Sequence, residues 1–361
     1  MAAVSIDFKS KFFAENHLKM RTEVGNQSSI GENARLPPYF QKNLHERKLV
    51  IKGQKSDPTR FEYIGFISFP IISYASGFIF YLYWTGVLIA ENVVISGGAH
   101  LCQETEQVFA SLNVTVSFGK GNAAEKRKVV KCSIHPEFNV SGIGENDIAL
   151  FLLDNRKPIS RTPIKIDGCH GIERGAHLKS FALQSSKVDN SNRSWSNAPP
   201  LRLTQGISSY IGKRKCMNKF SEEELIIEKF GTNVTIDLIS ESYMCAESSK
   251  HYGMCNTKDD KEHDFVYNGI VQGNYGSPLI SEGTEASEDI LVGLSGAFSS
   301  SCKGKEPNIF TRISEYREYI VEGLLNFGVN ILPKIECDTE NGNMGKIGRS
   351  EGKQKQTRRN R

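Results

Sequence analysis

Between about residues 50 and 315 the chain repeats one pattern: short β-branched and aromatic runs separated by Gly, Asn and Pro turns. Runs of this length and composition are typical of strands in antiparallel sheets. Many short strands without helical segments between them predict an all-β barrel or sandwich. The clearest runs are NVTVSF (113–118), RKVVKCSI (127–134), IALFLL (148–153), LRLTQGISS (201–209) and DILVGLSGAF (289–298).

One segment near the end of this region has a different period. SEYREYIVEGLLNF (314–327) is apolar at helical spacing, with Ser314 before it and Gly328 after it. Serine is a favourable N-cap and glycine a favourable helix end, so we predict a C-terminal α-helix that starts at a Ser314 cap.

The segment YIGFISFPIISYASGFIFYLYWTGVLIA (63–90) carries no charge and is long enough to cross a bilayer. However, Pro70 and Gly77 interrupt it, and polar residues alternate with apolar ones in places, as around Phe66-Ile67-Ser68. Paired β-strands are therefore the favoured interpretation. A transmembrane helix, and with it a membrane-anchored binding protein, is the alternative.

Both ends of the chain differ from the middle. Residues 1–49 are polar, and we interpret them as a propeptide-like extension. The last sixteen residues, KIGRSEGKQKQTRRNR (346–361), contain seven basic residues and one acid, whereas the whole chain has a net charge of +4. We expect 326–361 to be a disordered basic tail with a possible anionic polysaccharide partner; specific nucleic-acid binding is not expected.

Cysteines and glycosylation sequons indicate the secretory pathway. The eight cysteines are widely spaced and form no CxxC pair, which favours disulfides over a metal site, and we expect no metal or other cofactor. The start, MAAVSIDFKSKFFAENHLKM, has no apolar signal-peptide core, so either the start is incomplete or export is unconventional. Sequons occur at Asn26, Asn113, Asn139, Asn192 and Asn233.

Five segments, in order, resemble landmarks of the trypsin/chymotrypsin family of serine peptidases. The resemblance implies an all-β fold of two six-stranded antiparallel barrels over residues 50–325, a C-terminal α-helix, and an active site in the cleft between the barrels. The segments are GVLIAENVVISGGAHLC (86–102), ENDIALFLL (145–153), ESYMCAES (241–248), GNYGSPLI (273–280) and CKGKEPNIFTRISEYREYI (302–320).

The resemblance places the catalytic triad at His100, Asp147 and Tyr275, where the family has histidine, aspartate and serine. A phenol cannot replace the serine hydroxyl beside the histidine and still leave room for a peptide. Ser277, two residues later, would point elsewhere as a small residue in a tight turn. His100 lies eleven residues after Ile89 instead of the family's ten, so either a bulge absorbs the extra residue or Ala99 takes its place.

Two further family functions are altered. Asn274 replaces the aspartate that pairs with the new N-terminal ammonium after activation cleavage, and a neutral amide cannot supply that charge. The activation junction itself, ERKLVIKGQ (46–54), has also diverged.

In the substrate groove, the family's Ser-Trp-Gly corresponds to Ala297, Phe298 and Ser299, whose side chains would narrow the approach of a substrate to the backbone. We interpret the acidic insertion at 256–271 as a solvated loop.

The disulfides implied by the resemblance are partly rearranged. Cys216–Cys245 matches a family pair, and Cys255 is the obvious partner for Cys302, because the usual partner position is Val271. The other four cysteines allow three pairings, of which Cys102–Cys132 with Cys169–Cys337 is the one we predict.

We therefore expect a secreted, non-catalytic serine protease homologue that acts as a binding protein, cofactor or decoy in extracellular proteolysis. Its partner would be a protease, a protease substrate or an inhibitor. The alternative is an active serine endopeptidase with an atypical site.

Overall fold

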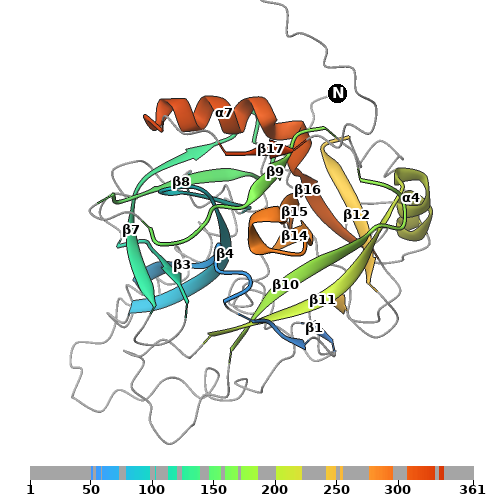
Figure 1. The fold of residues 1–361 in the computed structure, drawn as a ribbon, viewed down its shortest axis with the longest axis horizontal. Coiled ribbons are helices and arrows are strands. Elements are labelled where there is room, and N and C mark those ends of the chain that lie inside the picture. The colour runs from blue at the N-terminus through green and yellow to red at the C-terminus, as the bar shows by residue number, and fades with distance from the viewer. Residues whose placement is uncertain are drawn as a thin grey trace, which may run out of the picture.

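The computed structural model of the chain is shown in Figure 1. It describes residues 50–51, 54–57, 59–72, 79–97, 102, 113–119, 124–138, 146–155, 159–169, 172–185, 201–221, 241–248, 253–254, 276–295, 307–329 and 333–336.

The first half of the described chain forms a closed antiparallel barrel of six strands, in which each strand pairs with the next and the last with the first. In spatial order they are β3 (Ile64–Ile72), β4 (Ile79–Ala90), β5 (Val93–Ser96), β8 (Ala149–Leu153), β7 (Glu125–Ile134) and β6 (Thr115–Phe118). Along β6 buried and half-buried residues alternate, as the strand period requires.

The uncharged segment 63–90 supplies two neighbouring strands of this barrel. Strands β3 and β4 pair from Ile64 opposite Val87 to Ile72 opposite Ile79. The prediction of paired strands is confirmed, and the alternative of a transmembrane helix is wrong for this segment. Within the part of the chain that the structure describes, no helix is long and apolar enough to cross a membrane.

The second half forms another closed ring of six antiparallel strands, because β14 pairs with both β10 and β15. The predicted pair of six-stranded barrels is confirmed. The ring runs through β10 (His177–Ser185), β11 (Leu201–Ile211), β12 (Tyr243–Ser248), β16 (Asn308–Arg312), β15 (Ile290–Ser295) and β14 (Pro278–Ser281).

Short elements surround the second barrel. Strand β9 (Lys165–Asp167) lies parallel to β15, and β17 (Ile335–Glu336) lies parallel to β9. Two further short pairings and a helix complete the set: β2 (Gln54–Lys55) on β11, β1 (Val50–Ile51) with β13 (Gly253–Met254), and α4 (Lys213–Ser221). The 3-10 turn η5 (Ala286–Glu288) lies between β14 and β15. The predicted disordered tail, 326–361, starts too early, because Asn326 still belongs to the C-terminal helix and Ile335–Glu336 form β17 beside β9; residues 337–361 lie outside the described residues.

The C-terminal helix packs on the first barrel, although it follows the second in sequence (Figure 1). It begins as a 3-10 turn, η6 (Ile313–Tyr316), and continues as α7 (Arg317–Asn326). The predicted Ser314 cap is wrong, because Ser314 is buried inside the 3-10 turn and Tyr316 is the N-cap of α7. The tyrosine makes no side-chain cap bond.

The predicted helix end at Gly328 is confirmed. Gly328 has φ of +74°, and its N–H donates to Leu325 O at 2.9 Å. Val329 N–H donates to Leu324 O at 3.0 Å. These two bonds form the Schellman motif, which requires a left-handed residue that glycine adopts without steric cost.

One apolar cluster runs through both barrels. It includes Trp84 and Phe118 of the first barrel, Phe181 and Leu294 of the second, and Leu324 of α7. The Phe61 ring, just before β3, meets the Phe181 ring of β10 edge-on, with centroids 4.8 Å apart. The barrels are therefore packed against each other through buried side chains.

Candidate active site

Asp147, the predicted triad aspartate, follows a residue with an unusual backbone. Asn146 has φ of 58°, in the left-handed region that asparagine tolerates better than most residues. Its side-chain amide donates to Glu137 O at 2.9 Å, and its Oδ1 accepts a bond from Tyr316 Oη at 3.1 Å. Ile148 N–H donates to Asn146 O at 2.8 Å, which closes a three-residue turn around Asp147. Asp147 is only 1% exposed.

Replacing Asn146 with alanine should reduce the free energy of unfolding by roughly 2 kcal/mol, because it adds left-handed strain and removes both side-chain hydrogen bonds. Asn146→Gly should cost less than the alanine variant, since glycine adopts positive φ freely. Urea unfolding of both variants measures the difference. Equal losses would show that the backbone conformation contributes nothing.

His135 lies beside this turn. Its ring meets the rings of Tyr316 and Tyr319, with centroids 5.3 and 5.0 Å away, and its Nδ1 accepts a bond from Glu137 N–H at 3.2 Å. Burial lowers the pKa of His135, although Glu137 opposes the shift. The lowered pKa favours the neutral form of the imidazole.

Gly276, the residue after the predicted nucleophile position, lies where the two barrels meet. Its φ is +66°, and an added Cβ would overlap Ser96 Oγ and the Thr85 carbonyl oxygen of the first barrel. Gly276 N–H donates to Ser295 O at 2.8 Å. A Cβ on Gly97 would lie 3.3 Å from Gly276 N, so the two glycines bring their backbones into close contact.

These contacts assemble the three motif segments. Gly97, three residues before His100, lies beside Gly276, which is bonded to Tyr275. Strand β8, which follows Asp147, pairs with β5, which precedes Gly97. The side chains of His100, Tyr275 and Asn274 lie outside the described residues, so whether His100 faces the cleft stays a prediction.

Ser277, the nearest serine to the nucleophile position, is fully buried. Its hydroxyl donates to Thr85 Oγ1 at 3.2 Å, and its carbonyl oxygen accepts a bond from Ser295 N–H at 2.8 Å. Ser96 is also fully buried and donates to Thr85 O at 2.7 Å. The Ser277 hydroxyl therefore joins the two barrels, the Ser96 hydroxyl joins two strands of the first barrel, and both are buried away from a substrate.

Other predicted site residues divide between the described and undescribed parts of the chain. Asn113 is exposed, as a glycosylation acceptor must be. Outside the described residues lie the groove positions Ala297, Phe298 and Ser299, the insertion 256–271, and the sequons at Asn26, Asn139, Asn192 and Asn233. Among the described residues, no group of three or more His, Cys, Asp or Glu side chains could hold a metal ion.

Two predicted disulfides are confirmed. Cys102–Cys132 joins the segment after β5 to β7, and Cys216–Cys245 joins α4 to β12. Cys169 is also disulfide-bonded. The predicted pairs Cys169–Cys337 and Cys255–Cys302 each involve residues outside the described part and stay predictions.

A buried ion pair, which no sequence motif indicated, joins the two halves of the chain. Asp289 is fully buried, between η5 and β15, and both its carboxylate oxygens accept bonds from Arg60, with Nη2 to Oδ1 at 2.7 Å. Tyr63 Oη and Gly283 N–H donate to the same carboxylate. Burial and the bond to Asp289 raise the pKa of Tyr63, so the phenol stays protonated. Arg60 and Asp289 are 229 residues apart, and an Asp before an apolar strand resembles an ordinary turn residue.

The chain matches the trypsin family over residues 50–320 and belongs to it. A similar solved structure is neuropsin, a serine protease expressed in the limbic system of mouse brain, at 17% identity. That match covers 76% of this chain and 99% of neuropsin, with a TM-score of 0.49. No curated protein sequence gives a significant match.

Proposed function

We propose that this chain is a secreted, non-catalytic member of the trypsin family that acts by binding, as a cofactor or decoy in extracellular proteolysis. The observation that carries the proposal is the residue at the nucleophile position. Gly276 keeps a left-handed turn between the barrels, and the residue bonded to its nitrogen is Tyr275 instead of serine. Acyl transfer in this family requires a hydroxyl that histidine can deprotonate beside the scissile carbonyl.

The structure gives no support to a replacement nucleophile nearby. Ser277 and Ser96 are both fully buried, and both donate hydrogen bonds to Thr85. For Ser277 to reach a substrate, its bond to Thr85 across the barrels would have to break, and Ser96 would have to leave its bond within the first barrel. The burial of these two serines argues against the alternative of an active peptidase with an atypical site.

A binding role requires only the folded double barrel and its surface, which do not depend on a catalytic serine. Trypsin-like domains are commonly secreted, and the two confirmed disulfides fit an oxidising compartment. A rigid double barrel also presents several loops to a protein partner such as a protease, its substrate or an inhibitor. Fold alone does not define function, so the role depends on the altered site.

Tyr275→Ser should give no amidase activity above that of Tyr275→Ala. Restoring the hydroxyl leaves Asn274, the displaced His100 and the side chains at 297–299 in place, and triad groups act only as a unit. Hydrolysis of a panel of peptide anilides measures the two rates. A rate for Tyr275→Ser more than about tenfold above that of Tyr275→Ala would contradict cooperative loss of the site.

Labelling of the wild-type protein with a serine-reactive probe tests its predicted inactivity directly. A serine-reactive fluorophosphonate should leave it unlabelled, with active trypsin as the positive control. Covalent labelling that disappears in a Ser277→Ala variant would instead establish an active peptidase with an atypical nucleophile.

A further inference from the structure

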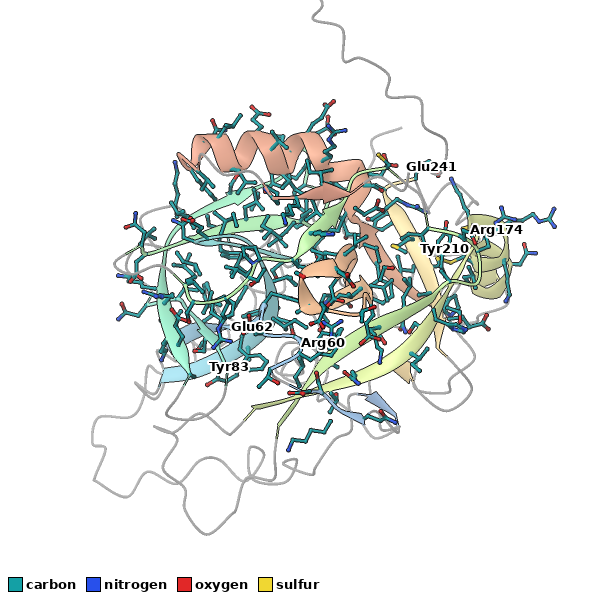
Figure 2. The ribbon with its side chains drawn as sticks, in the orientation of Figure 1. Arg60, Glu62, Tyr83, Arg174, Tyr210 and Glu241 are labelled. Carbon is teal, nitrogen blue, oxygen red and sulfur yellow. A yellow bond between two sulfur atoms is a disulfide. The ribbon has the colours of Figure 1, made fainter. Side chains whose placement is uncertain are left out.

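A basic pocket lies on the second barrel, between the end of β11, the start of α4 and the turn before β10. Its volume is about 730 Å³, and its wall includes Arg174, Arg214 and Lys215. Figure 2 shows Arg174 and Tyr210 at the α4 end of the molecule. The pocket shares no lining residue with the candidate active site.

The backbone holds Arg174 at this position. It lies in a turn in which Ala176 N–H donates to Glu173 O at 3.1 Å and Gly175 has φ of +87°. Gly175 N–H donates to Tyr210 O at 2.9 Å, which ties the turn to β11. A Cβ on Gly212 would lie 2.8 Å from Arg174 Nε, so the guanidinium packs directly over this glycine before α4.

The charges in the pocket are only partly compensated. Lys215 Nζ pairs with Glu247 at 2.9 Å, but neither Arg174 nor Arg214 has an acidic partner among the residues that the structure describes. Arg214 and Lys215 also lie in the first turn of α4, where the helix dipole disfavours cations. Arg174 and Arg214 therefore present two exposed guanidinium groups, without an acidic partner among the described residues, to one concavity.

We propose that this pocket binds a carboxylate side chain from an acidic segment of a partner protein. A guanidinium group matches a carboxylate through two parallel hydrogen bonds, which a lysine cannot reproduce. Tyr210 and Ile211 supply an apolar wall beside the charges.

The surrounding acids favour a short acidic segment over a long polyanion. Glu247 lines the pocket, Glu173 is exposed beside Arg174, and Glu241 pairs with Lys213 at 3.1 Å. A sulfated polysaccharide would meet these carboxylates along its length, whereas a single inserted side chain avoids most of them.

The test uses full-length protein in which glutamine replaces the seven basic residues of 346–361, so that the tail cannot contribute. Fluorescence anisotropy follows binding of a fluorescein-labelled (Glu-Gly)5 peptide at low salt. The double variant Arg174→Gln/Arg214→Gln should bind about tenfold more weakly or worse, because it loses two charge-assisted contacts. Gly212→Ala should weaken binding by roughly threefold without removing any charge, since it displaces the Arg174 guanidinium.

Lys213→Gln is the matched control. It removes the same charge one residue from Arg214, but Lys213 does not line the pocket, so affinity should change by less than about twofold. Thermal unfolding checks that every variant is folded. Because no catalytic readout is involved, the result is independent of the proposed inactivity.

Three outcomes would overturn the proposal. An equal loss in Lys213→Gln would show that only overall charge matters. Peptide binding by the unaltered protein that disappears in the tail variant would assign the site to the tail. A heparin fragment that requires both arginines, with no binding of the peptide, would identify a polysaccharide site instead.

Discussion

Asp289→Ala should lower the free energy of unfolding by about 3–5 kcal/mol, the usual cost of breaking a buried, hydrogen-bonded ion pair by removing one partner. The variant leaves the Arg60 guanidinium, with 22% of its side chain exposed, without its carboxylate. It also removes the acceptor for Tyr63 Oη and Gly283 N–H. Urea unfolding monitored by tryptophan fluorescence measures the loss.

Glu282→Ala is the matched control for Asp289→Ala. Glu282 lies on the same hairpin but is exposed; it pairs with Lys179 at 3.3 Å, and its charge makes only a minor contribution to the raised pKa of Arg60. Its removal should cost less than about 1 kcal/mol. A loss below that value for Asp289→Ala would show that the buried carboxylate does not join the barrels energetically.

Gly276→Ala should be destabilising by a similar amount, roughly 3–5 kcal/mol, through two effects that act together. A non-glycine residue at φ of +66° carries left-handed strain of about 1–2 kcal/mol. In addition, the new Cβ would overlap Ser96 Oγ and the Thr85 carbonyl oxygen and lie 2.9 Å from Gly97 N. Backbone atoms cannot move aside as a flexible side chain can, so the barrels must separate locally.

Gly328→Ala separates the two effects. Gly328 has a similar φ of +74°, but a Cβ there would meet nothing within 4 Å, so only the strain term applies. We expect a loss of about 1–2 kcal/mol for Gly328→Ala in the same urea experiment. Equal losses at the two glycines would mean that the contact between the barrels at Gly276 is loose.

The strands were predictable because each is short, β-branched and bounded by turn residues. The interruptions at Pro70 and Gly77, with partial alternation of polar and apolar residues, favoured strands over a membrane helix in 63–90, and β3 and β4 confirm it. Helix α4 gave no such signal, because KRKCMNKFS is mostly polar, and of its side chains whose burial the structure describes only Cys216 is fully buried. Ser314 was misassigned because a serine before a helical pattern is a cap only if the chain enters the helix there.

The sequence predicted which segments form the candidate active site, but it did not predict the side-chain contacts that hold them together. Ordered motifs identified the stretches around His100, Asp147 and Tyr275, and the structure brings the neighbours of these positions together. What motifs could not indicate is how the segments are held. The hydroxyl of Ser277 bonds to Thr85, 192 residues earlier, and Arg60 pairs with Asp289 across most of the chain. Contacts between residues so far apart in the chain leave no repeating pattern in the sequence from which they could be predicted.

The apolar cluster that spans both barrels affects how a partner can be bound. Hinge-bending between domains is the usual expectation only where their interface is small or polar. Here, opening would expose Phe181 and Leu294, both fully buried, and separate Phe61 from its aromatic neighbour. The two halves therefore present one rigid surface. In the proposed binding role, domain closure would then contribute little to discrimination between partners.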